Sequence, residues 1–192
     1  FLRDEYLPQS RTTLAAADLP DGRDYYRYLI RHFTTLDLTP EAIHELGLSQ
    51  VARIRGEMNG VMKKTGWSGD FAAFLQFLRT DPRFYAKSAE ELLKEASFIA
   101  KQMDGKLPAL FHSVPRMRYA VRAMTPAEAA GSTAANYQTG SLALGTSGYF
   151  TINALGYASE AKWRVETLFL HEAVPGHHLQ GARAAEIEGL HP

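Results

Sequence analysis

The residues best suited to chemistry lie in LFLHEAVPGHHLQ, Leu168 to Gln180, where histidines and a glutamate surround a proline-glycine pair. HExxH metallopeptidases need two histidines one helical turn apart, so that both imidazoles reach one zinc ion, and a glutamate that activates water. His171 and Glu172 supply the first half of this pattern, but position 175 is proline. The stretch therefore indicates a metal site whose second histidine is displaced along the chain.

The displacement leaves two histidines as candidates for the second ligand. On a straight helix His178 would lie about 10 Å beyond His171, whereas zinc holds each nitrogen at about 2.0–2.1 Å. Pro175 and Gly176 can create a bulge in the helix. A bulge of two extra residues would bring His177 to the ion, and one of three would bring His178. We favour His177, with His178 as the alternative ligand or as a supporting or substrate-contacting group.

A simpler interpretation needs no metal. A histidine on an apolar helix is usually a core residue with a satisfied hydrogen bond, and a Pro-Gly pair often just ends a helix. His177 and His178 would then sit on a solvated turn. The spacing departs from the usual expression for zinc peptidases, so the motif alone leaves both interpretations open.

The elements that must position these residues can be predicted from periodicity and capping signals. The chain up to residue 116 is mostly helical, with helices expected over residues 24–33, 40–66, 70–78 and 88–103. From Met117 the pattern alternates, which predicts two or three strands of a small antiparallel sheet within 117–158. Helical spacing resumes at Ser159 and carries the histidine motif through 159–190. The predicted fold class is mainly α with a small antiparallel β-sheet (α+β).

Composition bounds the function. With 192 residues and 45% hydrophobic content, the chain can bury one sizeable core, so we expect a single domain. Lys+Arg and Asp+Glu are equal at 21 each, which gives no field for nucleic acid or anionic membranes. Without cysteine, the strong candidates for metal ligands are His, Asp and Glu.

No apolar run is long enough to span a membrane, and no signal peptide is visible. Because the chain begins at Phe1, we expect a processed or excised piece, and no compartment is indicated.

The strand GYFTINA, Gly148 to Ala154, comes shortly before the histidine motif. It could form the edge of a cleft to which an extended peptide adds by β-pairing. Tyr149 and Asn153 are then candidate substrate-binding residues. The competing interpretation is a purely structural hairpin whose side chains alternate between its faces.

HEAVPGHHLQ, together with YYRYLIRHFTTLDLTPEAIHELGLSQVARIRGEM upstream, resembles the bacterial domain-of-unknown-function family 885, whose members are regarded as relatives of gluzincin zinc metallopeptidases. The resemblance extends over essentially all 192 residues. It implies a gluzincin-like helical fold with a small sheet beside the active-site helix, a zinc cofactor and a peptide or peptide-like substrate. The second histidine of the angiotensin-converting-enzyme group follows a glycine, and Gly176-His177 matches that dipeptide.

The resemblance also implies a missing part. Gluzincins take a third protein ligand from a glutamate on a later helix, which we expect beyond Pro192. Glu186 and Glu188 lie on the same helix as His177 or just past it, too far along the helix axis to fold back onto the ion. We therefore expect the N-terminal or central portion of a longer, here incomplete, metallopeptidase-like domain.

The resulting functional prediction is a zinc-dependent metallopeptidase. His171 and His177 would hold the ion, and Glu172 would be the general base. Two alternatives stay open, a non-catalytic helical binding module and a metal-dependent hydrolase of a non-peptide amide or ester.

Overall fold

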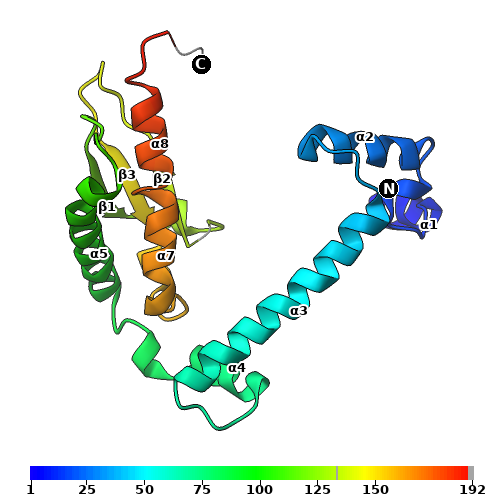
Figure 1. Cartoon of the computed structure of the whole chain (residues 1–192), viewed down its shortest axis with the longest axis horizontal. Coiled ribbons are helices and arrows are strands. Elements are labelled where there is room, and N and C mark those ends of the chain that lie inside the picture. The colour runs from blue at the N-terminus through cyan, green and yellow to red at the C-terminus, as the bar shows by residue number, and fades with distance from the viewer. Residues whose placement is uncertain (133, 190–192) are drawn as a thin grey trace. The chain divides into compact units, whose positions relative to one another are not determined.

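A computed structural model describes residues 1–132 and 134–189 of the chain (Figure 1). It forms two compact units, Phe1–Phe71 and Ala72–Pro192. The sequence predicts one domain. That residues 1–192 form part of a single longer domain stays a prediction. No helix among the described residues is long and apolar enough to cross a membrane.

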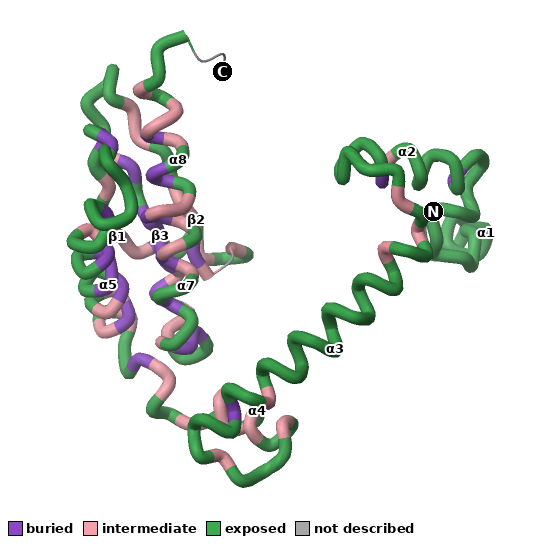
Figure 2. Tube along the Cα trace, in the orientation of Figure 1, coloured by how far each residue is buried: buried purple, intermediate pink, exposed green. Residues whose placement is uncertain are grey.

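The first unit is helical. Its elements are the π-helical turn η1 (Leu2–Tyr6), α1 (Leu7–Gln9), the 3-10 turn η2 (Ala16–Asp18), α2 (Gly22–Thr34) and α3 (Pro40–Lys64). The predicted start of α3 is confirmed, because the Thr39 side chain accepts a hydrogen bond from the Ala42 N–H and Pro40 occupies the first turn. Most of α3 is exposed, as the green tube in Figure 2 shows.

The second unit carries the histidine motif. Its helices are α4 (Phe71–Thr80), whose first residue is the last of the first unit, α5 (Ala89–Leu110), α6 (Pro126–Ala129), α7 (Lys162–Glu172) and α8 (His177–Ala184), with 3-10 turns η3 (Pro82–Phe84) and η4 (Ala154–Gly156). Its strands are β1 (Tyr119–Ala123), β2 (Ala135–Gln138) and β3 (Gly148–Ile152). The predicted class, mainly α with a small sheet, is confirmed.

The direction of one strand differs from the prediction. The sheet has the order β1-β3-β2, with β2 antiparallel to β3, as predicted, but β1 parallel to β3. The chain passes through α6 and β2 between β1 and β3, so β3 returns in the direction of β1. Alternating hydrophobicity indicates which face of a strand is buried, but it does not fix the strand's neighbours or direction.

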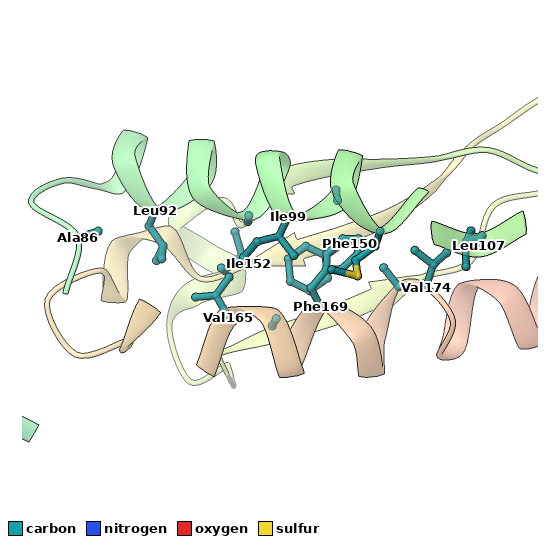
Figure 3. Close-up of a cluster of buried hydrophobic side chains, with 14 residues drawn as sticks. Ala86, Leu92, Ile99, Leu107, Phe150, Ile152, Val165, Phe169 and Val174 are labelled. Atoms are coloured by element: carbon teal, nitrogen blue, oxygen red, sulfur yellow. The ribbon is translucent and has the colours of Figure 1, made fainter. Parts of the chain in front are cut away.

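The core of the second unit lies where α5 and α7 pack beside the sheet (Figure 3). Phe150 of β3 and Phe169 of α7 are fully buried, with ring centroids 5.2 Å apart in an edge-to-face arrangement. Leu92, Ile99 and other residues at three- and four-residue steps form the buried face of α5. This core fixes α7, and with it His171 and Glu172, against the sheet.

The start of α5 gives a first prediction. The Ser88 hydroxyl accepts a hydrogen bond from the Glu91 N–H at 3.1 Å, and the Glu91 carboxylate accepts one from the Lys87 N–H at 2.9 Å. Ser88→Ala should lower the free energy of unfolding by about 1 kcal/mol, because it leaves a helix N–H without this acceptor. Urea unfolding followed by circular dichroism measures the change. Ser97→Ala, an exposed mid-helix control in α5, should cost nothing; an equal loss in both variants would refute the capping role.

Candidate metal centre

The hydrogen bonds between α7 and α8 show how the chain passes the proline. The Ala173 N–H still donates to the Phe169 carbonyl, four residues back, at 2.8 Å. The next carbonyl, that of Leu170, accepts from the Gly176 N–H at 3.0 Å. The donor is six residues on rather than the four of a regular helix, so the break absorbs two extra residues. His177 is six residues after His171. With two residues absorbed by the break, it takes the place that the fourth residue after His171 would have on a regular helix.

Gly176 is required for this backbone path. A Cβ atom added at this position would lie 1.7 Å from the His171 carbonyl oxygen and 2.6 Å from that of Leu170. These are backbone atoms and cannot rotate away. The close approach therefore explains why glycine precedes His177.

The break brings three of the predicted site residues together. Ligand atoms of His171, Glu172 and His177 all lie within 4.8 Å of one another. The two imidazole rings are 4.9 Å apart, centroid to centroid, and nearly perpendicular. Both histidines are exposed and Glu172 is half-buried, so an ion can reach the cluster from solvent. Two imidazoles and a carboxylate are ligands that zinc accepts, and the donor set fits that metal.

His178 is not part of this cluster. Only 2% of it is exposed, and its Nδ1 atom is hydrogen-bonded to the Tyr137 hydroxyl at 2.7 Å. Burial lowers the pKa of His178, which favours the neutral imidazole. Because consecutive residues on a helix point about 100° apart, a two-residue bulge that turns His177 to the cluster turns His178 inward. The structure thus separates the favoured second histidine from its alternative.

The prediction that the strand 148–154 forms the cleft edge is wrong. β3 is the central strand, and its two backbone edges pair with β1 and β2. Tyr149 lies on the sheet face away from Phe150, with the Arg122 guanidinium 5.5 Å from its ring centroid. The Asn153 side chain donates to the Ala129 carbonyl at 3.4 Å. Neither side chain belongs to the histidine cluster.

The strand beside the cluster is β2. Among the described strands it pairs only with β3, which leaves its other edge open. An open groove of about 450 Å³ runs between the strand and the helices; it is lined by Asn136, Tyr137, Thr139, Glu172, His177, Gln180, Gly181 and Ala184. The sequence predicted a strand here, but gave no signal that it borders the site.

Glu186 is held away from the cluster, as expected. Its carboxylate accepts a hydrogen bond from the Arg116 N–H at 2.6 Å and one from the Arg183 guanidinium at 2.8 Å. These donors lower the pKa of Glu186, the Arg116 N–H contributing most. The residue joins the end of α8 to the segment before β1.

Comparison with known proteins places this site in a family. The family described as "Bacterial protein of unknown function (DUF885)" matches residues 1–192. The chain belongs to this family. No curated protein matches it.

A solved structure shares the fold of this DUF885 chain. A "putative lipoprotein" from Colwellia psychrerythraea is similar to it with a TM-score of 0.81 and 29% sequence identity over 93% of the present chain. The present chain covers 31% of that protein, so it spans about a third of the relative's length.

Proposed function

We propose that this chain contributes the zinc-binding centre of a metallopeptidase. The observation that carries the proposal is the two-residue break, which brings His177 to His171 and Glu172 although the sequence lacks a regular HExxH spacing. Unrelated surface histidines would not require a glycine pressed against the preceding helical turn. The comparisons give the family but no activity.

His171 and His177 would hold the ion, and the third ligand would come from the rest of a longer protein. A zinc ion held in this way supplies a Lewis acid that polarises a carbonyl and acidifies water. His171 lies in the last turn of α7, and His177 is the first residue of α8. Packing of Phe169 in the core fixes the first of them, and the hydrogen bond to Leu170 fixes the second.

Glu172 would move the proton. It directly follows His171, is half-buried, and lines the groove beside β2. From this position its carboxylate can take a proton from water that attacks a carbonyl carbon, and then pass it to the leaving amine nitrogen.

The groove favours an extended peptide or peptide-like substrate. The open backbone edge of β2 offers N–H and C=O groups that a peptide can pair with, while Glu172 and His177 line the same groove. A peptide paired with β2 would therefore present its carbonyl groups to the cluster. Asn136 and Thr139, rather than Tyr149 and Asn153, become the candidate substrate contacts.

Zinc binding tests the proposal. The chain should take up one zinc ion per molecule on dialysis against trace zinc, measured by elemental analysis. His171→Ala and His177→Ala should each weaken binding at least about 100-fold, since losing a ligand costs more than losing a supporting group. His112→Ala, an exposed histidine outside the cluster, is the control.

The same measurement on a chain extended to the length of the Colwellia protein removes the effect of a missing third ligand. Absence of zinc from that longer chain would refute the metal centre. Full zinc occupancy without hydrolysis of any peptide in a mixed library would instead leave a binding module or a hydrolase of other amides and esters.

A further inference from the structure

His178 lies next to His177 in the sequence, but its side chain is buried against the sheet rather than exposed beside the cluster. We propose that His178 is a positioning residue, which fixes strand β2 against α8 and so sets the width of the groove beside the cluster. This inference rests on the proposed function for its consequence, but the contact itself does not. Three features of the described residues support it.

The first feature is the hydrogen bond to β2. The Tyr137 hydroxyl and Nδ1 of His178 are 2.7 Å apart, and the two rings meet edge to face with centroids 5.5 Å apart. Tyr137 also lines the groove with Glu172 and His177. The bond therefore joins β2 to α8, the two elements on either side of the groove, at the residue next to His177.

The second feature is the residue under the Tyr137 hydroxyl. A Cβ atom added at Gly148 of β3 would lie 2.0 Å from that oxygen and 2.7 Å from the ring carbon that carries it. Tyr137 can reach His178 because the neighbouring strand β3 has no side chain at Gly148. Gly148 has no positive φ, so the close approach of Tyr137, rather than backbone strain, is the reason for glycine here.

The third feature is the rigid support on the other side of His178. The Tyr119 ring of β1 packs against it with centroids 4.8 Å apart. The Tyr119 hydroxyl donates to the Asp104 carboxylate of α5 at 2.6 Å. His178 is thus held from β1 and α5, and it can act as a fixed anchor for the otherwise open edge strand.

These contacts give the two neighbouring histidines of α8 different roles. His177 faces the cluster and His178 faces the sheet, since successive side chains diverge by about 100°. Loss of the Tyr137 bond would leave the ligands in place and release β2. A substrate paired with β2 would then no longer be held at a fixed distance from Glu172.

Tyr137→Phe tests this inference, because it removes one oxygen and keeps the ring. Zinc affinity should stay within about twofold, since no ligand changes. Hydrogen exchange at the amides of residues 136–138 should accelerate at least about tenfold, with α7 unchanged, because the hydroxyl loses its hydrogen bond to His178 and its interaction with the Gly140 backbone. In the longer chain, KM for a fluorescence-quenched peptide library should rise more than kcat falls. Tyr157→Phe, a packed tyrosine for which the described residues show no hydroxyl hydrogen bond, is the matched control.

A pair of substitutions at His178 separates positioning from core packing. His178→Asn can still accept from the Tyr137 hydroxyl and should restore most of the exchange protection that His178→Leu loses. Equal protection in both variants, or unchanged exchange in Tyr137→Phe, would overturn the inference. If the longer chain hydrolyses no peptide, the proposed function fails, while the exchange measurement still decides whether His178 anchors β2.

Discussion

Glu172→Gln is expected to lower peptide hydrolysis by the longer chain about 10²–10⁴-fold, the usual contribution of a general base. The amide keeps the size of the side chain but cannot take the proton from water. Glu172 lies in the cluster with His171 and His177 and lines the groove, so no other described carboxylate can replace it. Initial rates on the peptide library, together with zinc content, measure the effect.

Zinc content identifies the role of the carboxylate in this variant. Retained zinc with lost hydrolysis is the result expected for a general base, whereas loss of zinc as well would make Glu172 a ligand. Glu166→Gln, an exposed glutamate on the same helix, should behave as the unchanged chain does. Full hydrolysis by the Glu172 variant would refute the proposed mechanism.

Gly176→Ala is expected to abolish zinc binding and to destabilise the second unit. The new methyl group would lie 1.7 Å from the His171 carbonyl oxygen, so the backbone must move apart at the point that joins α7 to α8. Strain of this kind costs about 1–3 kcal/mol, and the movement takes His177 away from His171. Urea unfolding and a zinc titration measure the two effects.

Gly105→Ala is the matched control for that variant. Gly105 lies inside α5, and nothing lies within 4 Å of a Cβ added there. Alanine should therefore stabilise the helix by about 0.5–1 kcal/mol and leave zinc affinity unchanged. If Gly176→Ala bound zinc as tightly as Gly105→Ala does, the two-residue break would not be needed for the site.

Much of the local structure could be predicted from the sequence. Thr39 and Ser88 mark helix starts because their side chains accept hydrogen bonds from the first free N–H groups. The spacing of apolar residues predicted the longer helices and two or three strands, since burial of one face repeats with the period of each element. The family followed from the histidine motif and the upstream helices. The absence of cysteine limited the strong candidates for metal ligands to His, Asp and Glu.

The position of β2 needed the tertiary structure. The residue pattern of 148–154 was compatible with an edge strand, but β1 pairs with β3 in parallel and leaves β2 beside the helices. Strand order depends on contacts between residues far apart in the chain, and a local pattern carries no information on them.

The motif itself shows where the sequence stops being sufficient. His171, Glu172 and a Pro-Gly bulge could be derived from residue types, yet His177 and His178 were both compatible with the second ligand position. In the structure, the Gly176 N–H donates to the Leu170 carbonyl, His177 lies beside His171, and His178 is buried against Tyr137. The sequence determined which groups are available near the bulge. Only packing of the helices on the sheet decided which histidine faces the solvent and which faces the core, because one residue turns a helical side chain by about 100°.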